Sequence, residues 1–331
     1  MASGVDRDPG ATNAAVTPAR THSSVMVAQN VAAAVISISE ENHSQSANQG
    51  ILWPMSLHNV TIGGGPQLVL AHGFTQNLQC WGPLAIDLAQ RHEVVLVDAP
   101  GHGRSYHDDA DLWEAGRLLG AAGSRPQGVG RPGEHRSEAA ERSPSVPGGG
   151  PATYVGYSMG GRAALHLALS QPELVRRLVL IGATAGLDTQ PERQERCDAD
   201  HVLAQRLLSD GLVAFIDAWL AGPLFATLTP EAACRDERLT NRPAGLAASL
   251  EHCGTGRQEP LWHRLHELDM PVLVIAGERD IKFTALGRRM VDSIGDNATL
   301  VVQPRANHAV HLEQPTEVSA LISAFAASAA R

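Results

Sequence analysis

Short apolar runs recur along the chain, and each ends at a glycine, an aspartate or a proline. Runs of this length and composition, bounded by turn residues, are typical of strands that are buried on both faces. With their turns included, they occupy residues 67–74, 93–103, 152–157, 177–184, 271–280 and 298–304.

Helical segments alternate with these runs. Residues 152–172, ATYVGYSMGGRAALHLALSQP, predict a strand, a tight turn and a helix that ends at Pro172. Residues 315–329 predict a last helix with a proline in its first turn. Alternating strands and helices indicate βαβ units, so the expected fold class is α/β, with a mostly parallel sheet flanked by helices.

Three segments depart from this alternation. Residues 1–50 are rich in Ala, Ser, Thr and Asn, which predicts a disordered N-terminal extension before one domain over residues 51–329. Residues 123–151 have hardly an apolar residue and predict a flexible surface insertion. Residues 185–265 contain amphipathic helical stretches and no clear strand. We expect them to form a helical cap over the carboxyl edge of the sheet, where α/β folds bind ligands.

Charge and composition argue against several classes of partner. A net charge of −9 disfavours nucleic acid and anionic membranes. No apolar run approaches the roughly 20 residues that a membrane span needs. The four cysteines lack C-x-x-C spacing, so we expect neither a metal site nor disulfides, and a cytoplasmic location. Lys282 is the only lysine, and we expect it to brace the loop of Asp280 through an ion pair.

Ser158 lies in the pentapeptide GYSMG, where a predicted strand meets a predicted helix. A serine in a strained strand-to-helix turn needs small residues two positions to either side, and Gly156 and Gly160 supply them. The start of the helix also directs backbone amides at the serine. We interpret Ser158 as a catalytic serine; the alternative is a small core residue in a glycine turn.

A catalytic serine needs a histidine as base, and the histidine needs an orienting carboxylate. After a serine in such a turn, the acid and then the histidine follow along the chain. Asp280 ends one predicted strand and His308 lies in the loop after the next, so both reach the same sheet edge. Asp98 is the rival acid and His311 the rival base, and Asp280 could instead cap a helix.

The stretch His-Gly-Phe at residues 72–74 follows the first apolar run. Its glycine lets the backbone approach the serine, so that the amides of Phe74 and Met159 can form an oxyanion hole. The order of oxyanion loop, serine, acid and histidine resembles the α/β-hydrolase superfamily over residues 57–329, apart from the insertion at 123–151.

Arg162 follows Ser158 by four residues, so on a helix both side chains face the pocket. A buried guanidinium needs an anionic partner. That partner is either an internal Asp or Glu or a carboxylate of the substrate, which the planar guanidinium binds in bidentate fashion.

Five further stretches carry a narrower resemblance. GYSMGGR, ERQERCDADHVLAQR, FIDAWLAGPLF, GERDIKF and NHAVHLEQP resemble the 2-succinyl-6-hydroxy-2,4-cyclohexadiene-1-carboxylate synthase family, which eliminates pyruvate in menaquinone biosynthesis. The resemblance covers both the catalytic core and the predicted cap. It implies a small polycarboxylate substrate, no cofactor and an elimination in which the triad makes Ser158 a base.

The same resemblance implies the residues of the site. The triad residues are Ser158, Asp280 and His308, and the residues implied in substrate binding are Tyr157, Arg162, Arg196, Trp219 and Arg238. As alternatives, Arg196 and Arg238 could be solvated helix residues and Trp219 a packing residue of the cap. The main rival activity is that of a serine carboxylesterase or C–C bond hydrolase, and the sequence does not indicate an oligomeric state.

Overall fold

The computed structural model describes residues 56–107, 109–124 and 151–328. The predicted extension, residues 1–50, and residues 125–150 of the predicted insertion lie outside the described residues. The first residue of that predicted insertion, Gly123, instead ends a helix and is buried. It packs so closely that an added Cβ would lie 2.4 Å from the hydroxyl of Tyr154.

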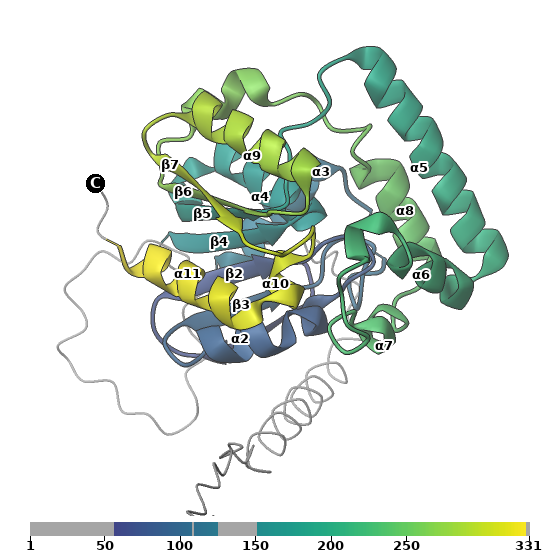
Figure 1. The fold of residues 1–331 in the computed structure, drawn as a ribbon, viewed down its shortest axis with the longest axis horizontal. Helices are drawn as coiled ribbons and strands as arrows, with labels where there is room; N and C mark the ends of the chain where they lie inside the picture. Colours follow the sequence, from purple (N-terminus) through teal and green to yellow (C-terminus); the bar gives the residue numbers. More distant parts are fainter. Residues whose placement is uncertain (1–55, 108, 125–150, 329–331) are drawn as a thin grey trace, which may run out of the picture. The chain divides into compact units, whose positions relative to one another are not determined.

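One sheet of seven strands runs through the described part of the chain, in the order β1-β3-β2-β4-β5-β6-β7 (Figure 1). β1 is antiparallel to β3, and all other neighbours are parallel. The strands are β1 (Asn59–Gly63), β2 (Gln67–Ala71), β3 (Glu93–Val97), β4 (Ala152–Tyr157), β5 (Val175–Ile181), β6 (Val272–Gly277) and β7 (Ala298–Gln303). The apolar runs do not predict β1, because this edge strand is only half-buried.

Helices cover both faces of the sheet (Figure 1). On one face lie α3 (Leu112–Gly123), α4 (Met159–Ser170) and α9 (Ile281–Ile294); on the other lie α2 (Gly82–Leu88) and α11 (Pro315–Ala327). Each face has its own apolar core, so neighbouring residues of one strand enter different cores. In β2, for example, Val69 belongs to one and Leu70 to the other.

Between β5 and β6 the described chain contains helices and no strand. They are α5 (Gln190–Asp210), α6 (Leu212–Leu220), η4 (Pro223–Phe225), α7 (Arg235–Arg238), α8 (Pro243–Cys253) and η5 (Trp262–Glu267). α5 begins at a capping box in which Thr189 and Glu192 bond reciprocally. Leu207, Ile216 and Leu246 belong to a small apolar core of this segment.

The remaining short elements connect these helices and strands. They are η1 (Leu78–Trp81), η3 (Pro172–Leu174) and α10 (Val310–Glu313). Among the described residues, no helix combines the length and the apolar character that crossing a bilayer requires. The α/β fold class with a mostly parallel sheet is therefore confirmed. Phe74, Ser158, Asp280 and His308 follow the carboxyl ends of β2, β4, β6 and β7.

Candidate active site

Ser158 lies at the sharp turn between β4 and α4. Its backbone has φ 49° and ψ −109°, a conformation that costs a residue other than glycine about 1–3 kcal/mol. Two hydrogen bonds hold the turn, from Ser158 N to Ile181 O at 2.8 Å and from Arg162 N to Ser158 O at 3.0 Å. The fold thus maintains a strained backbone in order to present this one side chain.

The two flanking glycines are required by space. A Cβ on Gly156 would lie 2.4 Å from Gly161 Cα, and a Cβ on Gly160 would lie 2.2 Å from the carbonyl oxygen of Ala71. Both contacts are with backbone atoms, which cannot rotate away as a side chain can. The close approach of α4 to β2 and β4 therefore depends on these glycines.

Ser158, His308 and Asp280 form a hydrogen-bonded chain. His308 Nε2 lies 3.3 Å from Ser158 Oγ, and His308 Nδ1 lies 2.7 Å from Asp280 Oδ2. Asp280 also caps α9, because its Oδ1 accepts from Phe283 N at 3.1 Å. The helix cap and the triad acid are therefore compatible roles of one carboxylate. With a proton on Nδ1, the His308 ring can accept the proton of Ser158 at Nε2.

The rival residues have other partners. Asp98 accepts hydrogen bonds from Leu78 N at 2.8 Å and Arg104 N at 2.9 Å, and so fixes the loop after β3. His311 packs against the Trp81 and Tyr157 rings, with centroids 4.8 and 4.1 Å away. Burial holds the pKa of His311 well below its usual range.

The loop after β2 passes directly beside the serine. A Cβ on Gly73 would lie 3.4 Å from Ser158 Cβ and 2.6 Å from Cε1 of Tyr157. Phe74 comes next in this loop, and Met159 N is the first amide of α4, where no intrahelical acceptor is available. The two amides predicted to form the oxyanion hole therefore come from the segments that flank Ser158.

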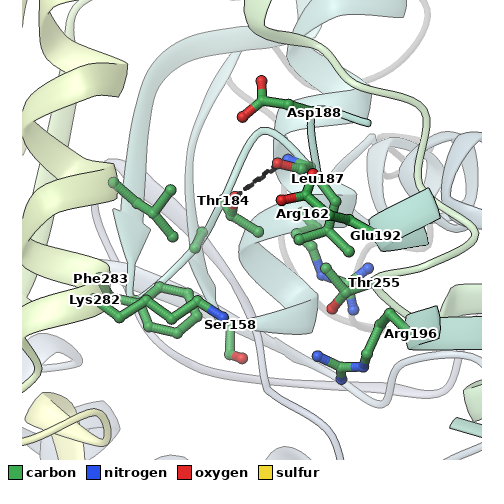
Figure 2. A pocket seen from close by; sticks show the side chains of 14 residues that line it. Ser158, Arg162, Thr184, Leu187, Asp188, Glu192, Arg196, Thr255, Lys282 and Phe283 are labelled. Carbon is green, nitrogen blue, oxygen red and sulfur yellow. Dashed lines mark hydrogen bonds between the residues drawn. The ribbon is translucent and has the colours of Figure 1, made fainter. Parts of the chain in front are cut away.

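A pocket of about 210 Å³ opens at Ser158. Figure 2 shows Arg162 and Arg196 on one side of the serine and Lys282 with Phe283 on the other. Ser158, Arg162 and Arg196, three of the site residues that the resemblance implies, line this one pocket. No cluster of His, Cys, Asp or Glu in the described residues is suited to hold a metal ion.

Arg162 is 7% exposed, and its Nη1 is buried without a hydrogen-bond partner. Burial lowers the pKa of its guanidinium to about 10. Asp200 is the acidic residue whose charge acts on it, but Asp200 is bonded to Arg196, with Oδ1 2.8 Å from Nε. Within the described residues, Arg162 forms no ion pair.

Arg196 and Asp200 pair one helical turn apart on α5. The side chain of Arg196 is 40% exposed and that of Asp200 only 3%, and burial raises the pKa of the aspartate. The Arg196 side chain is therefore held by a buried carboxylate and lines the pocket, so it is not simply a solvated helix residue. Arg162, Arg196 and Asp200 together carry one net positive charge, and Glu192, which lines the same side of the pocket, carries a negative one.

Tyr157, Trp219 and Arg238 do not line this pocket; they pack on the loop of Phe74. Tyr157 lies against Gly73, the rings of Trp219 and Phe74 are 5.3 Å apart, and Arg238 donates to the Thr75 hydroxyl. Arg238 is fully buried, so its interpretation as a solvated helix residue is wrong. Trp219 Nε1 and Arg238 Nη2 are buried without a partner.

Two features of the site do not follow from the sequence pattern. Asn307 Nδ2 donates to Pro223 O at 2.9 Å and so ties the loop of His308 to the helical segment. A bond to a backbone carbonyl leaves no signal in the sequence.

The ion pair expected of Lys282 is absent among the described residues. Its ammonium instead lies 5.9 Å from the centroid of the Phe283 ring.

Comparison with known proteins decides the family. A sequence profile of the Alpha/beta hydrolase family matches residues 68–321. The chain belongs to this family. A Bacillus subtilis protein provisionally named 2-succinyl-6-hydroxy-2,4-cyclohexadiene-1-carboxylate synthase is 36% identical over 83% of this chain and 100% of its own length. The synthase of that name from Yersinia pseudotuberculosis is 29% identical over 79% of this chain and 87% of its own length.

Solved structures agree with this α/β-hydrolase assignment. MenH from S. aureus superposes with a TM-score of 0.69 and 26% identity, over 81% of this chain and 97% of that one. A thermophilic esterase from Thermogutta terrifontis superposes with a TM-score of 0.62 and 21% identity, over 81% and 92% of the two chains. The second likeness concerns the fold alone.

Proposed function

We propose that this α/β hydrolase is a lyase that eliminates pyruvate from a polycarboxylate cyclohexene to give 2-succinyl-6-hydroxy-2,4-cyclohexadiene-1-carboxylate. Its synthase relatives support the reaction, and the single observation that carries it is the state of Arg162. A pocket for neutral esters gains nothing from a buried guanidinium that lacks a partner. A substrate carboxylate would supply both the charge and the bidentate geometry that this side chain needs.

The mechanism follows from the hydrogen-bonded chain. His308, held by Asp280, accepts the proton of Ser158, and the serine oxygen removes a proton from the cyclohexene ring. The electrons of that C–H bond form a new C=C bond, the ring double bond shifts so that the diene is conjugated, and the bond to the leaving oxygen breaks with its electron pair on that oxygen. Pyruvate therefore departs as its enolate, which takes up a proton to become the keto acid, and His308 gives up its proton to restore the starting state. The amides of Phe74 and Met159 stabilise the negative charge that develops on the substrate during proton removal. The arginines hold the carboxylates and so fix the ring against Ser158.

The proposal includes a small anionic substrate, no cofactor and a cytoplasmic site of action. All four cysteines are free, which favours a reducing compartment.

A second candidate activity is serine ester or C–C bond hydrolysis. The complete chain from Ser158 through His308 to Asp280 favours it, because this arrangement also activates serine as a covalent nucleophile. The two activities differ in their kinetics, since a covalent route gives a burst of acyl-enzyme and requires water as the second substrate.

The deciding experiment follows pyruvate release through lactate dehydrogenase, with the uncatalysed rate subtracted. We expect the wild-type protein to release pyruvate, and Ser158→Ala and His308→Ala each to lower kcat by about 10³-fold or more without loss of folding. Rapid turnover of a neutral aryl ester with an acyl-enzyme burst, and no pyruvate release, would instead establish the hydrolase.

A further inference from the structure

Lys282 is a pocket residue whose charge the fold does not use. It is the second residue of α9, two positions after the triad acid Asp280, and it lines the same pocket as Ser158. In Figure 2 its side chain extends from α9 toward Ser158, from the side opposite Arg162 and Arg196. The side chain is exposed, so its ammonium is available to a bound molecule.

The position is electrostatically unfavourable for a lysine. The N-terminus of a helix carries partial positive charge, which disfavours a cation in the first turn by a few tenths of a kcal/mol to about 1 kcal/mol. Arg162 and Arg196 line the same pocket and add further positive charge. No described carboxylate pairs with Lys282 to offset this charge, and its ammonium lies near the ring of Phe283.

Two carboxylates line the pocket, and only one of them is in an ion pair. Asp188 accepts two hydrogen bonds of 2.7 Å from Arg289, and Glu192 accepts from Thr189 N at 3.0 Å in the capping box of α5. The Arg289 guanidinium offsets the charge of Asp188, whereas Glu192, whose partners are neutral, keeps its negative charge on the side of Arg162 and Arg196. Positive groups still stand on two sides of Ser158, and no described carboxylate forms an ion pair with Arg162 or with Lys282. A molecule with one carboxylate would satisfy only one of them.

We infer that Lys282 is a substrate-binding residue, which pairs with a second carboxylate of the substrate, distinct from the one that Arg162 binds. The inference rests on the proposed function, because that substrate carries several carboxylates. Lys282 and Arg162 then hold the ring from opposite sides, with the reacting C–H bond between them at Ser158. A lysine suits the outer position because its ammonium is a point charge on a flexible stem, which tolerates movement as product leaves.

The first test compares Lys282→Gln with Arg288→Gln in the pyruvate assay. Arg288 is an exposed residue on the same helix and does not line the pocket, so the control makes the same change of charge on α9. We expect Lys282→Gln to raise KM about 5- to 10-fold with kcat changed less than about 2-fold, as for loss of a partly exposed ion pair that holds the substrate. Lys282→Arg should return KM to within about 3-fold of wild type, because it keeps the charge.

The second test does not require turnover. Binding of benzene-1,2,4-tricarboxylate and of benzoate is measured by calorimetry in the same variants. Lys282→Gln should weaken the tricarboxylate about 5- to 10-fold and leave benzoate, whose single carboxylate Arg162 can hold, within about 2-fold. Arg288→Gln should change neither ligand by more than about 2-fold.

The outcomes separate the two proposals. Pyruvate release with the same KM in Lys282→Gln and Arg288→Gln would overturn the role of Lys282 and leave the proposed function standing. Absence of pyruvate release from the wild type would overturn the proposed function, while the tricarboxylate assay would still decide on Lys282. An equal loss of tricarboxylate and benzoate binding in Lys282→Gln would also contradict a second, separate carboxylate site.

Discussion

At the scale of single residues, the site is organised around charges that lack partners. Removing one partner of a buried pair leaves a group whose desolvation is no longer offset, so folded proteins rarely keep such groups without a reason. Arg162 is in that state, with Nη1 buried and unpaired and a pKa lowered by burial. The fold gains no ion pair from Arg162, and under the proposed function a substrate carboxylate beside Ser158 would supply the missing partner.

Replacement of Arg162 should therefore damage catalysis and spare the fold. We expect Arg162→Ala to lower kcat/KM for the anionic substrate about 30- to 1000-fold, equivalent to about 2–4 kcal/mol for a charge-assisted bidentate contact in a partly dry pocket. Arg162→Lys should recover only part of this, because it keeps the charge and loses the planar geometry.

Thermal unfolding supplies the control for this substitution. The Tm of Arg162→Ala should equal or exceed that of the wild type, since an unpaired buried charge is removed. A fall in Tm together with loss of turnover would identify an internal ion pair with Asp200 instead.

The sequence predicted those residues whose positions follow from local geometry. Asp280 and His308 end or follow predicted strands, and Arg162 shares a helix face with Ser158, so spacing alone placed them together. The burial of Arg238 could not be predicted in this way. α7 has only four residues, too few to show a helical period, and the partner of Arg238 is a threonine more than 160 positions away.

At the scale of elements, catalytic geometry depends on how closely α4 approaches β2. The N-terminal turn of α4 contacts the backbone at the end of β2, and the loop that carries Phe74 begins at that point. Any separation of the two elements would therefore move Ser158 away from the amide of Phe74. Long elements such as α5 and α11 could be predicted from the sequence, whereas this distance depends on tertiary packing.

Gly160→Ala tests this close approach, with Gly64→Ala as its matched control. The added methyl group would meet the Ala71 carbonyl oxygen at 2.2 Å at position 160, whereas at position 64 it meets nothing within 4 Å. We expect Gly160→Ala to lower the free energy of unfolding by about 1–3 kcal/mol or more and to abolish most of the activity. Gly64→Ala should lie within about 0.5 kcal/mol of wild type, as surface substitutions usually do. Similar unfolding midpoints in urea for the two variants would contradict this account.

At the scale of the whole molecule, the buried network around the sheet edge depends on neutral histidines. His72 Nε2 accepts from Ala99 N at 3.0 Å, and His102 Nε2 accepts from Thr75 N at 3.2 Å, which a protonated ring could not do. Burial lowers the pKa of His102 to about 3 and that of His166 to about 4. The number and spacing of histidines do not reveal these lowered pKa values, because the loop residues His72 and His102 and the α4 residue His166 become buried only in the assembled fold.

Stability should therefore fall as the solution becomes acidic, before most carboxylates titrate. Below pH about 6.5, the histidines of the unfolded chain bind protons, whereas the buried rings of the folded protein stay neutral. The free energy of unfolding therefore decreases as pH falls. Each such ring contributes a slope of up to about 1.4 kcal/mol per pH unit to the free energy of unfolding, down to pH about 4 for His166.

Urea titrations between pH 7 and 4.5 test this expectation. The free energy of unfolding of His166→Gln should fall less steeply with pH than that of the wild type, by up to that amount. His263→Gln, which removes an exposed histidine, should keep the wild-type slope. A wild-type slope in His166→Gln would contradict this account. It would mean that His166 takes up its proton within the folded protein and that the buried rings are not the source of the acid sensitivity.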